Sequence, residues 1–143
     1  MKRIITFCTI AAGLIWLGII PAMAATLVAK VSLSTQRMTV IDQGQVKYNW
    51  SVSTARQGKV TPTGAWTAKK LKRFHWSSRY GRAAMPYSIF YSGNFAVHGT
   101  NTLSKLGTPA SAGCIRLSKS NAAILFSMAK RAGIENTRII VQH

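Results

Sequence analysis

The residues most suited to take part in a chemical reaction are His98 and Cys114, which lie on either side of a short connector. A thiolate attacks an acyl carbon while an imidazole takes and returns the proton, so this pair is the minimum apparatus for nucleophilic acyl transfer. A glycine adjoins each residue, Gly99 after the histidine and Gly113 before the cysteine. Because glycine lets the backbone come close to a reacting atom, the pattern predicts a thiol enzyme that forms an acyl intermediate.

Three further groups around the cysteine suit supporting roles. Arg116 is expected to stabilise the thiolate and so lower the thiol pKa, or to bind a substrate carboxylate through two hydrogen bonds. The Cys114 N–H and neighbouring amides are expected to hold an oxyanion, with Gly113 giving the substrate access to the backbone. Ser111 offers a hydroxyl to the site. Each has a structural alternative: a turn for Gly113, a cap for Ser111 and exposed surface for Arg116.

The first 24 residues have the three parts of a secretory signal peptide. Lys2 and Arg3 precede an apolar run over 4–20, and small residues stand at Ala22 and Ala24. We expect cleavage after Ala24 and a single domain over 25–143, exported to the periplasm or cell envelope. The alternative is an uncleaved anchor, for which the run is slightly shorter than the roughly 20 residues of a spanning helix.

Cysteine usage favours a chemical role for the remaining thiol. Of the two cysteines, Cys8 lies in the predicted signal peptide, so Cys114 is alone in the expected domain. An unpaired thiol in an oxidising compartment needs a reason to be there, since it is exposed to oxidation. The alternative is a buried cysteine that acts as a small apolar residue.

The charge balance is strongly basic, with 19 Lys and Arg against 2 Asp and Glu and a net charge of +17. Removing Lys2 and Arg3 leaves +15 on the expected domain. Such a charge attracts polyanions, and for an exported protein we expect anionic envelope polymers and no nucleic acid. The basic segment 69–73, with aromatic residues after it, is either an anion-binding face or a solvated loop.

Two carboxylates and three histidines restrict the possible chemistries. Asp42 and Glu135 lie in turn-like segments without the paired arrangement that a glycosidase needs. His75, His98 and His143 are scattered along the chain, so we expect no metal site and no cofactor. His75 is interpreted as structural or solvent-facing rather than catalytic.

The alternation of apolar and polar residues predicts a mainly β domain with one clear helix near the C-terminus. Over 46–53 it places Val46, Tyr48, Trp50 and Val52 on one face of a strand. A helix is predicted over 119–132, between a Ser118 cap and a Gly133 stop. Residues 69–85 are predicted to be a long loop, His98 to end a strand, and the tryptophans at 50, 66 and 76 to pack in the core. Strands are predicted over 26–33, 38–41, 46–53, 65–67, 87–91, 95–97 and 138–141.

The segments 98–100 and 111–117, with the Leu106-Gly107 connector between them, resemble the active-site signature of the L,D-transpeptidase catalytic domain (YkuD-type) family. The Thr61–Gly64 turn and residues 85–89 are similar to that family too. The resemblance implies sandwich-like mixed β-sheets and a cysteine acyl-enzyme acting on peptidoglycan stem peptides, in cell wall biogenesis and cell shape. It assigns Cys114 as the nucleophile and His98 as the proton donor and acceptor. Ser111, Gly113 and Arg116 match supporting positions.

In the mechanism that the resemblance implies, Cys114 attacks a tetrapeptide donor between diaminopimelic acid and the terminal D-Ala. D-Ala leaves, and an amine on a second stem peptide resolves the thioester into a cross-link. One departure is Ala112, where family members often have histidine. Water, a protein amine or a D-amino acid as acceptor is an alternative reaction. A basic wall-binding module with a vestigial site is an alternative of another class.

Overall fold

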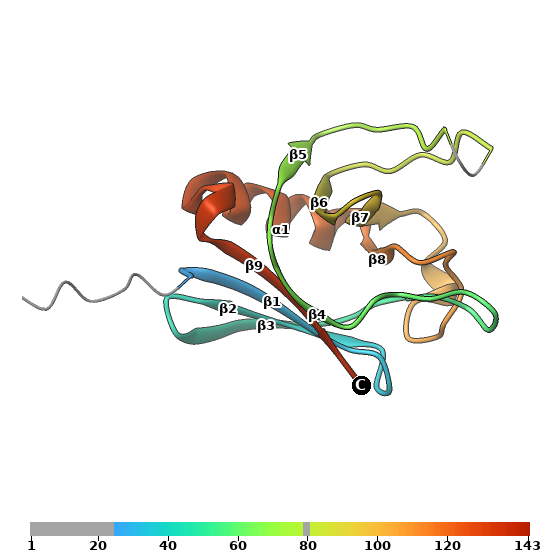
Figure 1. The fold of residues 1–143 in the computed structure, drawn as a ribbon, viewed down its shortest axis with the longest axis horizontal. Helices are drawn as coiled ribbons and strands as arrows, with labels where there is room; N and C mark the ends of the chain where they lie inside the picture. Colours follow the sequence, from blue (N-terminus) through green and yellow to red (C-terminus); the bar gives the residue numbers. More distant parts are fainter. Residues whose placement is uncertain (1–24, 79–80) are drawn as a thin grey trace, which may run out of the picture.

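The computed structural model describes residues 25–78 and 81–143, so the predicted signal peptide lies outside the described residues. Two β-sheets and one α-helix make up this part (Figure 1). No helix in it is long and apolar enough to cross a membrane. The elements are β1 (Leu27–Ser32), β2 (Arg37–Asp42), β3 (Gln45–Ser51), β4 (Gly64–Thr67), β5 (Lys70–Lys72), β6 (Ser88–Ser92), β7 (Phe95–Thr100), η1 (Leu103–Lys105), β8 (Ile115–Ser118), α1 (Lys119–Ala132), η2 (Ile134–Asn136) and β9 (Thr137–Gln142).

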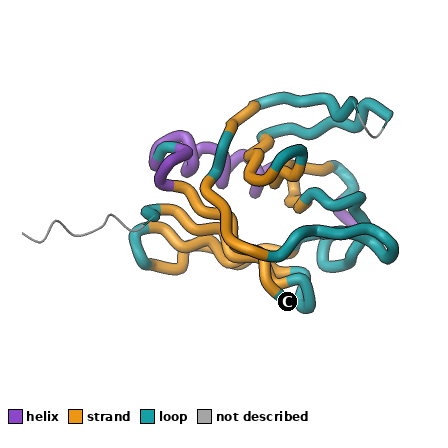
Figure 2. The backbone as a smooth tube through the Cα atoms, viewed as in Figure 1, coloured by secondary structure: helices purple, strands orange, loops and turns teal. Residues whose placement is uncertain are grey.

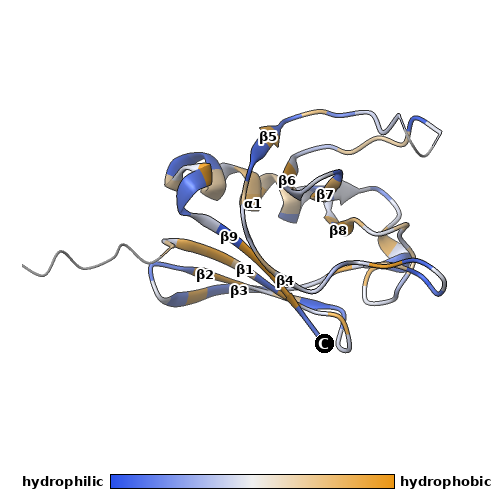
Figure 3. Ribbon diagram, in the orientation of Figure 1, coloured by the Kyte–Doolittle hydropathy of each residue, from blue (hydrophilic) through white to orange (hydrophobic). Residues whose placement is uncertain are grey.

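Both sheets are mixed, which confirms the predicted fold class. The five-stranded sheet has the order β3-β2-β1-β9-β4, with β1 and β9 parallel. The four-stranded sheet has the order β5-β6-β7-β8, with β7 and β8 parallel. Apolar positions gather along β1 and β8 (Figure 3), and side chains of both sheets and α1 form one buried core. The two parallel pairs fix which chemical groups meet at the end of the four-stranded sheet.

The predicted ends of the helix are confirmed. The Ser118 hydroxyl accepts a hydrogen bond from the Asn121 N–H at 3.2 Å, which satisfies one of the free donors of the first turn. Gly133 ends the helix at a φ of 89°, and its N–H donates to the Ala129 carbonyl. Because β8 runs directly into α1, the helix N-terminus lies beside the end of the four-stranded sheet.

The prediction of an unstructured loop over 69–85 is wrong in part. Residues 70–72 form the edge strand β5, and the chain beyond it folds back on itself in a ladder of three backbone hydrogen bonds. These bonds join Tyr87 to Arg73, Met85 to His75 and Ser77 to Ala83. The strand is only three residues long and carries two lysines, so it shows too little alternation to be recognised. The paired excursion over 73–87 becomes a wall of the pocket described below.

Three finer expectations also differ from the structure. The register shifts between Val40 and Ile41, so Val46 pairs with Ile41, the alternation on β3 is interrupted, and Val46 is 66% exposed. His98 lies within β7 rather than at its end, because pairing with β8 extends the strand to Thr100. Trp76 is 51% exposed rather than packed in the core, in an edge-to-face contact with Phe74. The expected packing holds for the two half-buried tryptophans, Trp50 and Trp66.

Candidate active site

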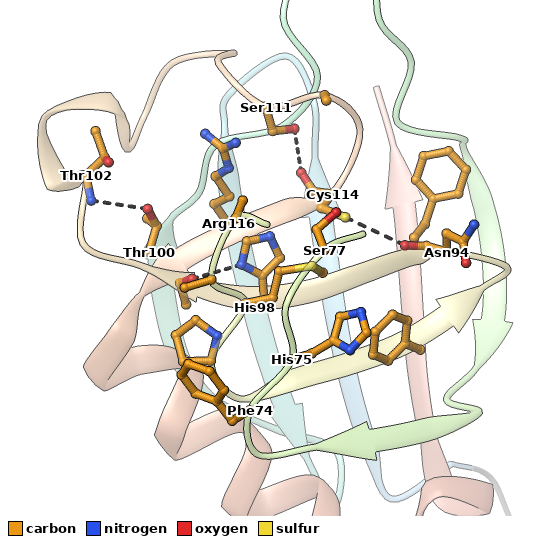
Figure 4. Close-up of a pocket in the computed structure, with 18 of the residues that line it drawn as sticks. Phe74, His75, Ser77, Asn94, His98, Thr100, Thr102, Ser111, Cys114 and Arg116 are labelled. Atoms are coloured by element: carbon orange, nitrogen blue, oxygen red, sulfur yellow. Dashed lines mark hydrogen bonds between the residues drawn. The ribbon is translucent and has the colours of Figure 1, made fainter. Parts of the chain in front are cut away.

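Loops gather at one end of the molecule (Figure 2), and a pocket of about 740 Å³ opens there. His98 of β7 and Cys114, directly before β8, both line this pocket (Figure 4). The excursion over 73–87 forms another wall through residues that include His75 and Ser77. The structure therefore brings the predicted nucleophile and the predicted base into one cavity.

The parallel register of β7 and β8 explains how the two side chains reach the same side of the sheet. Val97 pairs with Ile115 and His98 with Arg116. Side chains alternate along a strand, and paired residues share a face. Val97 and Ile115 point into the core, where both are buried. Their neighbours His98, Cys114 and Arg116 consequently face the pocket.

The imidazole of His98 is fixed by one backbone hydrogen bond. Its Nδ1 lies 2.8 Å from the Gly99 carbonyl oxygen, and because a carbonyl only accepts, Nδ1 carries the proton. Nε2 is then the unprotonated nitrogen, available to take a proton from the pocket side. Only 6% of His98 is exposed. Burial lowers the pKa of His98 to about 4, with Arg116 adding to the effect and the Gly99 hydrogen bond opposing it.

The Cys114 thiol is half-buried and donates to the Asn94 carbonyl, 3.8 Å away in the turn between β6 and β7. Burial raises the pKa of Cys114, while the Ala96 backbone and Arg116 act in the opposite direction. Arg116 thus acts on the thiol pKa in the expected direction, but burial outweighs its charge and the net shift is upward. Both shifts favour the uncharged forms of the two groups, a thiol and a neutral imidazole.

Ser111 holds the loop that carries Cys114. Its hydroxyl donates to the Cys114 carbonyl at 2.6 Å and accepts from the Gly113 N–H at 3.0 Å. Its own N–H donates to the Thr54 carbonyl, and the Thr61 hydroxyl donates to the Gly113 carbonyl. The hydroxyl thus positions the backbone on both sides of the thiol. The Gly113 N–H is already bonded, whereas the Cys114 N–H adjoins the thiol and is a candidate donor to an oxyanion.

Gly113 has a packing role that differs from the expected one. Its φ of 141° is a conformation that side chains rarely adopt, and a Cβ there would lie 2.6 Å from Cε1 of Phe95 and 2.9 Å from the Val60 carbonyl oxygen. The residue is buried and is not part of the pocket wall. The close approach that requires glycine is therefore made by the protein's own Phe95 and Val60, and not by a substrate.

Gly99 is buried and packs closely against other parts of the protein, although it also lines the pocket. A Cβ at this position would lie 3.0 Å from the Lys119 Cα and 3.2 Å from Cγ of Pro86. The Gly99 N–H donates to the Pro86 carbonyl. The carbonyl that orients His98 is thus held between the excursion and the start of α1.

Arg116 is half-buried and lines the pocket, and no hydrogen bond or ion pair of its guanidinium is found within residues 25–78 and 81–143. Its backbone is held by a reciprocal pair of hydrogen bonds with Ser53. The side chain therefore presents an unpaired cation to the pocket, from a fixed point on β8.

Several pocket residues could not be assigned to the site from the sequence. Arg56 and Lys119 line the pocket from distant segments, and neither has a local motif that marks it. His75 lines the pocket as well, half-buried and with its ring edge-on to Phe90. Burial, with the charges of Lys72 and Lys70, lowers the pKa of His75. Within the described residues there is no group of His, Cys, Asp or Glu that would hold a metal ion.

Comparison with solved structures places the fold among L,D-transpeptidases. The structure of an L,D-transpeptidase from Mycobacterium smegmatis superimposes with a TM-score of 0.74 at 22% identity, covering 83% of this chain and 59% of that one. An L,D-transpeptidase structure from Mycobacterium tuberculosis H37Rv superimposes with a TM-score of 0.74 at 24% identity, covering 82% of this chain and 58% of that one. An L,D-transpeptidase structure from Stackebrandtia nassauensis superimposes with a TM-score of 0.72 at 25% identity, covering 82% of this chain and 56% of that one. This chain thus spans less than two thirds of the length of these structures.

A thiol and a neutral, backbone-tethered imidazole in one pocket is an arrangement suited to cysteine-based acyl transfer. The sequence model of the L,D-transpeptidase catalytic domain (YkuD) matches residues 27–141. The chain therefore belongs to the L,D-transpeptidase catalytic domain family. Among curated proteins, none is similar enough to this sequence to count as a match.

Replacement of Gly113 tests its packing role. Gly113→Ala should lower the free energy of unfolding by roughly 2–4 kcal/mol, because the methyl group meets Phe95 and Val60 in addition to the backbone strain. Gly58→Ala is the matched control, since Gly58 also has a positive φ but no atom within 4 Å of a built Cβ. The control should lose only about 1 kcal/mol. Equal losses in urea denaturation would contradict the steric account.

The pH dependence of thiol alkylation tests the neutral resting pair. Because burial raises the Cys114 pKa, the thiolate population should grow only above the ordinary range of a cysteine, about 8.5. The rate of iodoacetamide alkylation should therefore rise continuously from pH 6 to pH 10, with no plateau at acidic pH. His98→Gln should keep this profile, as His98 is neutral throughout that range. A rate that is already constant between pH 5 and pH 8 would show an ion pair instead.

Proposed function

We propose that this protein is an L,D-transpeptidase that acts on peptidoglycan stem peptides through an acyl-enzyme on Cys114. The observation that carries the proposal is the meeting of Cys114 with His98, whose Nδ1 is tethered to Gly99, in the pocket of a domain of this family. The stem peptide, the covalent intermediate and the residue roles belong to the proposal.

In the first half-reaction, Nε2 of His98 takes the thiol proton as the sulfur attacks the diaminopimelate carbonyl of a tetrapeptide donor. The carbonyl oxygen becomes an oxyanion that accepts a hydrogen bond from the Cys114 N–H. The tetrahedral intermediate then collapses and the bond to the D-Ala nitrogen breaks. His98 gives the proton to that nitrogen, so D-Ala leaves as a neutral amine and a thioester remains on Cys114.

In the second half-reaction, the amine of an acceptor attacks the thioester carbonyl. His98, again neutral, takes the proton that the nitrogen loses, and the carbon–sulfur bond breaks. The proton returns to the sulfur, which restores the resting thiol and imidazole. With water in place of the amine, the same steps give hydrolysis, and a protein amine or a D-amino acid gives anchoring or exchange.

Arg116 is suited to hold a carboxylate of the donor, because its guanidinium faces the pocket without a protein partner. Ala112 lines the same pocket with a methyl group, and so contributes no side-chain hydrogen bond there. The supporting functions consequently rest on backbone groups, the Ser111 hydroxyl and Arg116.

The first test is incubation of the protein with a disaccharide-tetrapeptide, followed by mass spectrometry, beside a Cys114→Ala variant. We expect release of D-Ala and a cross-linked dimer from the wild type, and loss of both in the variant, because alanine has no nucleophile. Circular dichroism should show the variant folded. His98→Gln should reduce the rate at least a hundredfold, since the proton no longer has an acceptor.

Each other result of this test has its own meaning. Release of D-Ala without a dimer would replace the transpeptidase with a hydrolase or with an enzyme that uses another acceptor. No turnover from a folded protein that still binds the wall would favour the vestigial binding module.

We also propose that the protein is exported by a signal peptide over residues 1–24 and is held near anionic polymers of the cell envelope by a net charge of +15 on residues 25–143. Most lysines and arginines of the described part are exposed or half-buried, where their field extends into the solvent. The exposed Phe74, which directly follows the basic segment 69–73, lines the pocket.

Salt tests the charge-based retention. Binding to isolated walls should fall at least tenfold between 50 mM and 500 mM NaCl, because the Debye length shortens and exposed charges are screened. The measurement is co-sedimentation, with a neutral polysaccharide gel as the control. Retention that does not change with salt would contradict electrostatic holding and would indicate specific contacts.

A further inference from the structure

Three cationic side chains and no carboxylate line the pocket around Cys114. The cations are Arg56, Arg116 and Lys119. The chain has only two carboxylate residues, Asp42 and Glu135, and neither lies in the pocket wall. A cavity with this much uncompensated positive charge is complementary to an anionic ligand. One carboxylate pairs with one guanidinium, so Arg116 accounts for one anionic group, and two cations remain.

The backbone of Arg56 is hydrogen-bonded to the loop that carries Cys114. Its N–H donates to the Ser111 carbonyl at 2.9 Å, and its carbonyl accepts from the Lys59 N–H at 3.0 Å. Ser111 is the residue whose hydroxyl holds the backbone of Gly113 and Cys114. The Arg56 side chain is exposed and lines the pocket. Its backbone is therefore anchored to the loop that carries Cys114, while its exposed guanidinium stays accessible to a ligand in the pocket.

Lys119 is held in the same way on the side of the histidine. It is the first residue of α1, and its Cα would be 3.0 Å from a Cβ on Gly99, the residue that orients His98. A cation in the first turn opposes the positive end of the helix, and no acidic residue compensates it there. The lysine therefore does not stabilise the helix at this position. It is suited instead to bind an anionic ligand at the start of the helix, where the free backbone N–H groups also attract negative charge.

We propose that Arg56 and Lys119 are specificity-determining residues that select acyl donors with a second free carboxylate, in addition to the terminal D-Ala carboxylate. Among the other free carboxylates of a tetrapeptide donor, we assign this second group to the one on the side chain of diaminopimelic acid, the residue whose carbonyl Cys114 attacks. The inference rests on the proposed function for the identity of the donor. It names a feature of the substrate that the pair of Cys114 and His98 does not determine.

Binding to the Cys114→Ala protein tests the selection without turnover. Calorimetry compares a tetrapeptide with a free side-chain carboxylate and the same peptide amidated there. The free peptide should bind about tenfold more tightly. Arg56→Gln and Lys119→Gln should each weaken the free peptide five- to tenfold and change the amidated peptide less than twofold.

Matched controls are available at the far end of α1. Lys130→Gln and Arg131→Gln remove the same charges from exposed positions outside this pocket, and should change neither affinity more than twofold. Three results would overturn the inference. The pocket variants could lose the same affinity for both peptides, the control variants could lose as much affinity as the pocket variants, or the wild-type pocket could show no preference for the free carboxylate.

Turnover separates this inference from the proposed function. In the protein that keeps Cys114, Arg56→Gln and Lys119→Gln should lower kcat/KM for D-Ala release from the free donor by the same factors, mainly through KM. If the wild type releases no D-Ala but the binding preference is found, the transpeptidase proposal fails and the carboxylate site stands. If D-Ala is released without discrimination between the donors, the carboxylate site fails and the transpeptidase proposal stands.

Discussion

The parallel pairing of β7 with β8 is the constraint on which the site depends. It sets His98 beside Arg116 and places Cys114 at the entrance of β8, all on the face opposite the core. A parallel pair needs a connection that returns to the other end of the sheet. Here that connection ends in the Ser111 to Cys114 loop, so the same loop closes the topology and delivers the nucleophile. A shift of β8 by one residue against β7 would turn Cys114 and Arg116 toward the core, while His98 would keep its face.

Much of this architecture could be predicted from the sequence where the signals were local. Alternation indicated most of the strands, and the Ser118 and Gly133 signals gave both ends of α1. The Cys–His pair was apparent from residue types, and its meeting in one pocket follows the strand register. The β5 strand was missed, because its pairing depends on β6 and not on a pattern of its own. The excursion after it was missed because its two arms pair with each other without any alternation in the sequence.

Properties that depend on the surroundings could not be predicted from the residues. The sequence indicated an arginine beside the thiol, but the sign of the thiol pKa shift follows from burial, which depends on the folded pocket. The same is true of Gly113, where the identity of the approaching atoms, Phe95 and Val60, requires the fold. Arg56 and Lys119 lie far apart in sequence, so their common position at the pocket comes only from tertiary structure.

Arg116 has two candidate roles, to stabilise the thiolate or to bind a substrate carboxylate. Its effect on the pKa values of both Cys114 and His98 distinguishes between them. Its charge lowers the pKa of Cys114 and also lowers the pKa of His98. Transfer of a proton from sulfur to nitrogen depends on the difference between these pKa values, so a cation that moves both in the same direction does little to drive it. The barrier left by burial is instead reduced where charge develops on the substrate, at the oxyanion. Within the proposed function, Arg116 is therefore better suited to bind a substrate carboxylate than to stabilise the thiolate, in line with a guanidinium that lines the pocket.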